Sequence, residues 1–151
     1  MKRNWLLIIC LFVFTTSIYS QTFTTTSGVS SGIEIDAQGN FTQVQGTLNI
    51  EPTLTLEENF TVSAVGLALF KEDLPKFYVG SELGYVFWKN TPQKTTLAIT
   101  GRYLYGSAGA QLIGTGLNYN VDKTTIGAKG DWNYQDKTAL LTLEMSYLIL
   151  Y

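Results

Sequence analysis

The sequence predicts an all-β fold, an eight-stranded antiparallel up-and-down transmembrane β-barrel with short turns. Three observations lead to this prediction. Turn-forming residues recur at short intervals, the segments between them alternate apolar with polar or small residues, and aromatic residues gather near the ends of those segments. No stretch shows a sustained 3.6-residue apolar period, so we expect almost no helix.

The chain begins with a segment typical of a secretory signal peptide. Lys2 and Arg3 precede an apolar run over residues 5–14, and Ser20 is a small residue at a suitable cleavage point. The apolar run is too short to span a bilayer comfortably, and no stop-transfer segment follows it. We therefore assign residues 1–20 to a cleaved signal peptide and residues 21–151 to one β-barrel domain.

Composition excludes several classes of function. The only cysteine, Cys10, lies inside the signal peptide, and Ile9 before it disfavours a lipoprotein signal. The sequence has no histidine, so we expect neither a transition-metal site nor a histidine-dependent hydrolase or acyltransferase, and no cofactor. Without Lys2 and Arg3, eight basic residues remain against twelve acidic ones, and this balance argues against a nucleic-acid partner.

Seven turn signals divide the rest of the chain: "DAQGN", "EEN", "KEDLP", "NTPQ", "GSA", "DK" and "QDK". Between them we expect eight strands, over 22–35, 40–56, 59–70, 76–89, 94–105, 108–121, 124–134 and 138–151. Tight turns between consecutive strands favour a meander in which sequence neighbours pair.

One predicted strand, 59–70, departs from the two-faced pattern. Its apolar residues fall on both faces, Phe60, Val62 and Phe70 on one and Val65, Leu67 and Leu69 on the other. A β-bulge near Gly66 would bring both sets to the same face. Strict alternation also places Phe41 and Trp88 on the inward face.

Alternation alone does not decide which face lies outside. A secreted soluble barrel of the lipocalin or streptavidin kind would turn its apolar face inward to bind a small apolar ligand, whereas a membrane barrel would turn it to lipid. Charged residues are only 15% of the chain, against roughly 25% in soluble domains. This scarcity favours the membrane barrel, because a solvated outer surface would carry more charge.

Aromatic placement favours the same alternative, because the apolar-face aromatics form two girdles as at membrane interfaces. If Gln21 starts on the periplasmic side and the strands alternate in direction, one girdle lies at the periplasmic rim and comprises Phe23, Phe60, Phe87, Tyr119 and Tyr151. The other, at the external rim, comprises Phe70, Phe77, Tyr103, Tyr105, Trp132 and Tyr134. About twelve residues at ~3.3 Å, tilted near ~45°, span roughly 28 Å, close to the hydrocarbon thickness.

The inward faces carry few charges. Near the middle of their strands lie Glu82, Arg102, Lys129, Asp131 and Glu144, which we expect to form an ion-paired network in the lumen. Gly114 and Gly116 would either leave room for the inward ion pairs or allow their strand to coil. A narrow eight-stranded barrel is filled by its side chains, so a structural network is favoured over a proton or ion path, or over acid–base catalysis by Glu82 and Glu144.

The last strand ends "LTLEMSYLILY", with apolar or aromatic residues at alternate positions: Leu143, Met145, Tyr147, Ile149 and Tyr151. This pattern resembles the C-terminal strand of bacterial outer-membrane barrels, which implies recognition by the barrel-assembly machinery. Residues 21–151 together resemble the small OmpA/OmpX-type barrels. The resemblance implies an integral protein of the Gram-negative outer membrane, in contact with its lipid.

With a periplasmic N-terminus, the external turns are "DAQGN", "KEDLP", "GSA" and "QDK". They are too short to form an adhesive surface, so the wall and rims of the barrel remain as recognition surfaces. Ala64, Gly66 and Ala68 give one strand a smooth outer face that could dock against a larger outer-membrane protein. The leading hypothesis is a non-enzymatic structural or accessory subunit of a larger outer-membrane complex. The alternatives are the soluble ligand-binding barrel and an enzyme that uses Glu82 or Glu144.

Overall fold

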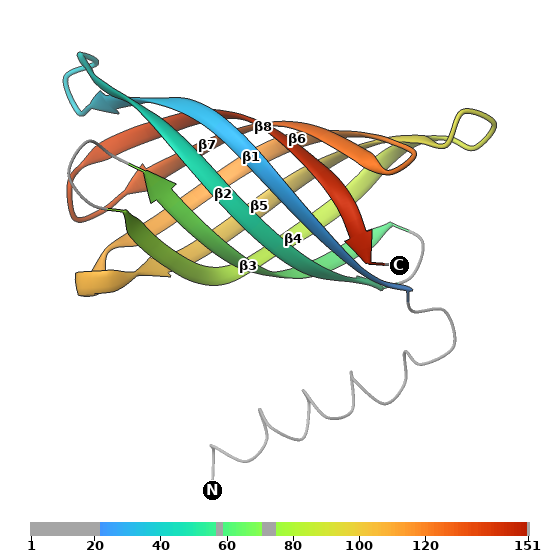
Figure 1. The fold of residues 1–151 in the computed structure, drawn as a ribbon. Helices are drawn as coiled ribbons and strands as arrows, with labels where there is room; N and C mark the ends of the chain where they lie inside the picture. Colours follow the sequence, from blue (N-terminus) through green and yellow to red (C-terminus); the bar gives the residue numbers. More distant parts are fainter. Residues whose placement is uncertain (1–21, 57–58, 71–74, 151) are drawn as a thin grey trace, which may run out of the picture.

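A computed structural model describes residues 22–56, 59–70 and 75–150, which form a closed antiparallel β-barrel of eight strands (Figure 1). Each strand pairs with the next, and the last pairs with the first. The strands are β1 (Thr22–Asp36), β2 (Phe41–Leu56), β3 (Phe60–Phe70), β4 (Lys76–Asn90), β5 (Thr95–Gly106), β6 (Gln111–Val121), β7 (Thr124–Asn133) and β8 (Thr138–Leu150).

The predicted fold class and strand number are confirmed, and the predicted strand ends agree with the structure to within three residues. A single turn of 3-10 helix, η1 (Ser107–Gly109), lies in the β5–β6 connection. Within the described ranges, no helix is long and apolar enough to cross a membrane. The predicted signal peptide and Tyr151 lie outside the described residues.

β1 begins and β8 ends at the same end of the barrel, here called the terminal end (Figure 1). The β1–β2 turn at the opposite end shows how local chemistry closes a hairpin. The Asp36 carboxylate accepts hydrogen bonds from the backbone N–H groups of Gln38 (2.9 Å) and Asn40 (2.8 Å). Gly39 between them adopts φ +87°, a backbone conformation that favours glycine.

Two β-bulges correct the predicted orientations of Phe41 and Trp88. In the β1–β2 ladder the register shifts after Glu34, so Phe41 pairs with Ile35 and is 62% exposed. In the β4–β5 ladder it shifts after Val86, and Trp88 is 42% exposed on the outer face. An extra residue in a strand reverses the alternation beyond it. The prediction that both aromatics point inward is therefore wrong.

The expected bulge near Gly66 is also wrong. The described pairs of β3 with β2 and with β4 keep one register along the whole strand. Val65, Leu67 and Leu69 consequently point into the barrel and are buried, while Phe60, Val62 and Phe70 are exposed. The apolar residues of β3 occupy both faces because the lumen contains an apolar layer as well as a polar one.

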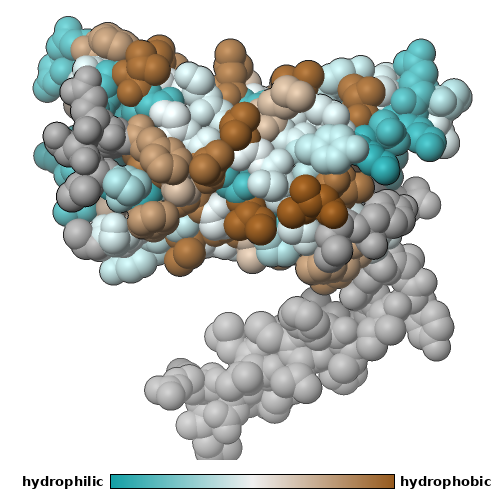
Figure 2. Space-filling model, viewed as in Figure 1, coloured by the Kyte–Doolittle hydropathy of each residue, from teal (hydrophilic) through white to brown (hydrophobic). Residues whose placement is uncertain are grey.

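The two faces of the barrel differ sharply in polarity. Large apolar side chains are exposed over the wall, and hydrophilic residues gather at the ends of the barrel (Figure 2). The buried side chains inside include every residue of the predicted ion network. The apolar faces thus lie outside, which overturns the alternative of a soluble barrel with an apolar interior.

Candidate functional site

The centre of the lumen is an ammonium group shared by three carboxylates. Lys129 of β7 places Nζ 3.3 Å from Glu51 Oε1 of β2, 3.1 Å from Glu82 Oε2 of β4 and 3.2 Å from Glu144 Oε2 of β8. Its side chain is 1% exposed. Lys129 Nζ donates hydrogen bonds to Glu51 Oε1 and Glu82 Oε2, and the Glu144 carboxylate adds an ion pair.

A second ion pair lies beside this group. Arg102 Nε donates to Asp131 Oδ1 at 2.7 Å, and Arg102 Nη2 donates to Asp131 Oδ2 at 2.5 Å, in the two-pronged geometry of a strong arginine–carboxylate pair. Arg102 is on β5 and Asp131 on β7, so the pair crosses over β6.

Gly114 of β6 is what permits that crossing. It pairs with Arg102 on one side and with Asp131 on the other. A Cβ atom at this position would collide with the Asp131 carboxylate. Gly116, two residues further along β6, likewise leaves space for the Lys129 side chain, because a Cβ there would come within 2.7 Å of Lys129 Cγ. The expectation that both glycines make room for the ion network is confirmed.

The structure therefore brings the five predicted lumen residues together in two adjacent groups. Sequence reasoning left out Glu51, the third carboxylate on Lys129, and Glu34, whose carboxylate accepts hydrogen bonds from Gln43 and Gln45 nearer the opposite end. Both are on the inward face of their strands by simple alternation. Including every inward-facing charge, rather than only those at mid-strand, would have found them.

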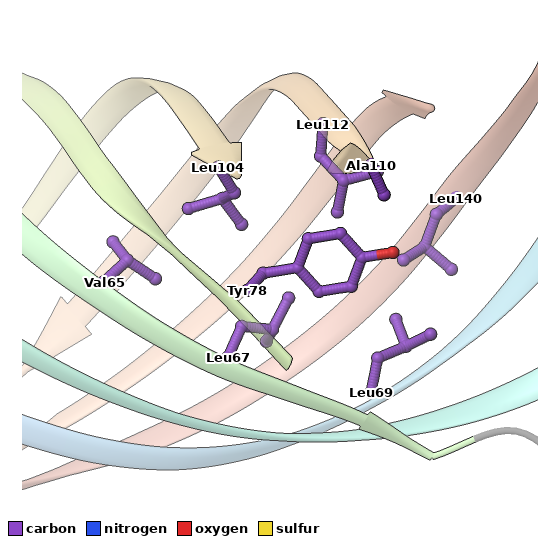
Figure 3. Close-up of a cluster of buried hydrophobic side chains, with 8 residues drawn as sticks. All are labelled: Val65, Leu67, Leu69, Tyr78, Leu104, Ala110, Leu112 and Leu140. Atoms are coloured by element: carbon purple, nitrogen blue, oxygen red, sulfur yellow. The ribbon is translucent and has the colours of Figure 1, made fainter. Parts of the chain in front are cut away.

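An apolar plug closes the lumen on the side of the opposite end. It consists of eight buried residues: Val65, Leu67, Leu69, Tyr78, Leu104, Ala110, Leu112 and Leu140. The Tyr78 ring lies among the other side chains, and its hydroxyl points toward Leu140 (Figure 3). The cavity beside Tyr78 and Leu140 measures only about 10 Å³, roughly the minimum for one water molecule.

The terminal-end half of the lumen is lined by small polar side chains, several of them hydrogen-bonded to one another. Thr53 and Ser63 hydroxyls lie 2.8 Å apart, and Asn120 connects Thr96 (2.8 Å) to Thr125 (2.6 Å). The lumen thus has three zones along the barrel: small polar residues, paired charges and an apolar plug. Within the described residues, no cluster of histidine, cysteine or acidic side chains is placed to hold a metal ion.

The outer wall carries the predicted aromatic residues at both rims. At the terminal end the exposed aromatics are Phe23, Phe60, Phe87 and Tyr119. At the opposite end they are Phe70, Phe77, Tyr103, Tyr105, Trp132 and Tyr134. On β8 the outward residues of the predicted assembly signal are Leu143, Met145, Tyr147 and Ile149.

Three hollows lie in the described part of the wall. The smallest, about 350 Å³, lies over β2, β3 and β4, where Gly66 and Ala68 are bordered by Ile50, Phe77 and Val79. A second, about 400 Å³, lies over β6, β7 and β8, and the largest of the three, about 730 Å³, lies over β7, β8, β1 and the start of β2. All three are lined mainly by apolar side chains, and all lie outside the lumen.

An exposed apolar wall, aromatic residues at each rim and a closed, charged lumen together define a transmembrane β-barrel. No protein-family model matches this sequence, and neither does any curated protein.

Solved structures do match the fold. Neisserial surface protein A (NspA) is similar over 85% of this chain and 98% of its own, with 12% identity and a TM-score of 0.55. Ail, the attachment invasion locus protein of Yersinia pestis, is similar over 85% and 97%, with 13% identity and a TM-score of 0.51.

A de novo designed barrel, TMB2.3, is similar over 85% of this chain and 95% of its own, with 20% identity and a TM-score of 0.53. At these identities the likeness establishes the fold alone. The chain has the fold of the eight-stranded bacterial outer-membrane barrels.

Proposed function

We propose that this protein is an integral, non-enzymatic barrel of the outer membrane that serves as a structural or accessory subunit beside a larger outer-membrane protein. The observation that carries the proposal is the closed lumen. Among the described residues, ion pairs occupy its centre and an apolar plug lies toward the opposite end, where the cavity beside Tyr78 and Leu140 measures only about 10 Å³. Recognition must then take place on the outside of the barrel.

The charges in the lumen support a structural role rather than catalysis. Glu82 and Glu144, the two candidate acid–base carboxylates, both contact Lys129 Nζ. A carboxylate that is buried and paired in this way is held away from any substrate. The residues exported past the predicted cleavage site contain neither cysteine nor histidine that could act as a nucleophile or base.

Because the connections between strands are short, the wall is the larger surface on which a partner could bind. Between the strand bounds that the structure describes, the longest connection has five residues, 71–75. Binding in such barrels usually depends on long external loops. On the wall, the outward side chains of β3 are small at Ala64, Gly66 and Ala68, which lets another transmembrane segment approach closely.

The proposal also includes the route by which the protein reaches the outer membrane. The predicted signal peptide would direct export, and the alternating apolar residues of β8 would be recognised by the barrel-assembly machinery. A chain truncated before Leu143 should therefore fail to accumulate in the outer membrane.

Membrane location is tested by comparing unheated and boiled samples of the outer-membrane fraction on a semi-native gel. A closed barrel should remain folded without heating and change mobility on boiling. Recovery in the soluble fraction, without detergent and without a mobility change, would refute the outer-membrane assignment.

The accessory role is tested by photo-crosslinking from the wall. A photoreactive amino acid at Ala68 should crosslink to one larger outer-membrane protein, whereas the same group at Leu117, on the outer face of β6, should not. Equal crosslinking from both positions would indicate random collision in the membrane and would contradict docking through β3.

A further inference from the structure

The charges around Lys129 do not balance. Its single ammonium group contacts carboxyl groups from three glutamates, Glu51, Glu82 and Glu144. Each of these side chains is at most 10% exposed, so water screens them little. The neighbouring Arg102 does not supply the missing positive charge, because its two-pronged contact with Asp131 is already a neutral pair. With all three glutamates ionised, the Lys129 group would carry uncompensated negative charge.

The rest of the barrel brings no further positive charge to this point. Within the described strands, β3 and β6 carry no acidic or basic residue, and the two lysines of β4 lie at its ends. Glu34 and Asp36, the acidic residues of β1, lie nearer the opposite end. The charged groups around Glu51 are Glu82 from β4, Arg102 from β5, Lys129 and Asp131 from β7, and Glu144 from β8.

This crowding favours a bound proton on one of the glutamates. The three contacting oxygens all lie within 3.3 Å of Lys129 Nζ, so they are also close to one another. Carboxyl groups that share a buried site do not all ionise, because a bound proton removes the repulsion between like charges.

Asn49 indicates which glutamate holds the proton. Asn49 and Glu51 both point inward from β2, and Asn49 Nδ2 donates to Glu51 Oε1 at 3.1 Å. The other end of the same amide, Asn49 Oδ1, is buried and accepts no hydrogen bond within the described part of the chain. An ionised Glu51 has only acceptor oxygens, whereas a protonated Glu51 has an O–H group to donate. Acid and amide can then form a pair joined by two hydrogen bonds.

Both observations coincide only at Glu51. Glu82 and Glu144 share Lys129, but neither accepts a hydrogen bond from an amide side chain of the described residues. Gln45 donates to Glu34 and also has a buried oxygen without a donor, but Glu34 is not among the glutamates on Lys129. The argument from crowded charges therefore does not extend to Glu34.

We propose that Glu51 is a proton-binding site in the lumen. At neutral pH it is a carboxylic acid that donates to Asn49 Oδ1, while Glu82 and Glu144 are ionised on Lys129. As the pH rises, Glu51 releases its proton to water and a further uncompensated negative charge appears inside the barrel. The barrel thereby becomes less stable in alkaline solution. This inference concerns the interior and does not depend on the accessory role.

Infrared difference spectroscopy of the folded barrel in lipid vesicles tests the site, because a protonated carboxyl group and a carboxylate absorb at well-separated frequencies. Subtracting the spectrum of Glu51→Gln from that of the wild type at neutral pH should leave a protonated-carboxyl band and no carboxylate band. Asp136→Asn is the control, since Asp136 pairs with Lys76 on the surface, and its difference spectrum should contain carboxylate bands alone. Carboxylate bands from Glu51 would overturn the proposal.

Unfolding in urea at several pH values provides a second measurement, which needs only the wild type if Glu51→Gln does not fold. Glutamate in an unfolded chain is ionised above about pH 5, so the folded barrel binds one proton more than the unfolded chain. The unfolding equilibrium constant should therefore rise by up to about tenfold per pH unit between roughly pH 6 and pH 8. The chain has no histidine, so few other groups titrate in this range.

Glu51→Gln matches the protonated acid in shape and charge, so its unfolding constant should change much less with pH. The mobility change on boiling shows for each variant that the barrel is folded. A wild-type constant that does not rise with pH, or equal pH dependence in wild type and Glu51→Gln, would show that Glu51 is ionised and refute the proton site.

Discussion

Lys129 is the residue that balances most of the negative charge buried in the lumen. Its ammonium group contacts carboxylates from β2, β4 and β8, strands that do not pair with one another. Buried charges of like sign repel strongly unless an opposite charge lies among them. The lysine therefore links three strands that no backbone hydrogen bonds join directly to one another.

Replacing Lys129 by methionine should lower the free energy of unfolding by about 3–5 kcal/mol, because it leaves three buried carboxylates without their partner. Lys76→Met is the matched control, since Lys76 pairs with Asp136 at 3.3 Å where both side chains are more than a third exposed. That surface pair should contribute at most ~1 kcal/mol. Urea titration in lipid vesicles measures both values, and equal losses would contradict the central role of Lys129.

Glycine 114 provides a second test at the residue scale. Gly114→Ala introduces a Cβ that collides with the Asp131 carboxylate and should displace it from Arg102. We expect a loss of about 3 kcal/mol, as for a broken buried ion pair. Gly101→Ala, on the outer face of β5, meets nothing within 4 Å and should change stability little. The same urea titration compares them, and a harmless Gly114→Ala would show that the pair does not need this glycine.

At the scale of single elements, β3 differs most from a regular membrane strand. Its inward residues Val65, Leu67 and Leu69 contribute three of the eight side chains of the plug. Its outward residues at the centre of the strand are small. The inner face of β3 is therefore apolar where a membrane strand is usually polar, and it helps to close the lumen. Its outer face is smooth because the outward side chains are small.

The orientation of β3 is tested by truncating one plug residue. Leu67→Ala should cost about 2–5 kcal/mol, because it opens a cavity in a packed interior. Ala68 is the next residue in the chain and faces outward, so Ala68→Leu should leave the free energy of unfolding nearly unchanged. If the loss at Leu67 were as small as that at Ala68, Leu67 would face lipid and the strand would contain the bulge that the structure lacks. Thermal unfolding in detergent is a sufficient measurement.

At the scale of the whole molecule, the barrel presents lipid-compatible surface around its full circumference and aromatic rings at both rims. The two tryptophans beyond the predicted signal peptide lie at opposite rims, Trp88 at the terminal end of β4 and Trp132 at the far end of β7. They therefore report on the two membrane interfaces separately.

Fluorescence quenching in brominated lipids tests this placement. In Trp88→Phe and Trp132→Phe variants, the remaining tryptophan should be quenched most by bromine near the headgroups and least by bromine at the acyl-chain ends. The signal in unbrominated lipid serves as the reference. Maximal quenching by the deepest bromine for either residue would place that rim inside the hydrocarbon and contradict the girdle assignment.

Much of the fold could be predicted because its signals are local. Turn residues such as those around Gly39 mark the hairpins, and alternation along β8 or β5 marks the two faces of each strand. Phe41 and Trp88 escaped prediction because a bulge changes the alternation without leaving a clear mark in the sequence. The apolar face of β3 was misread for another reason, since nothing local distinguishes a plug residue from a lipid-facing one.

The sequence by itself determined the strand number, the strand ends and the set of residues able to meet in the lumen, because each depends on neighbours along the chain. Only the tertiary structure decided which of them meet. Glu51 reaches Lys129 from a strand far away in the sequence, across an interior that exists only once the barrel has closed. The hollow beside Leu143 likewise forms only where β8 joins β1, the one pair of strands that brings the two ends of the barrel sequence together.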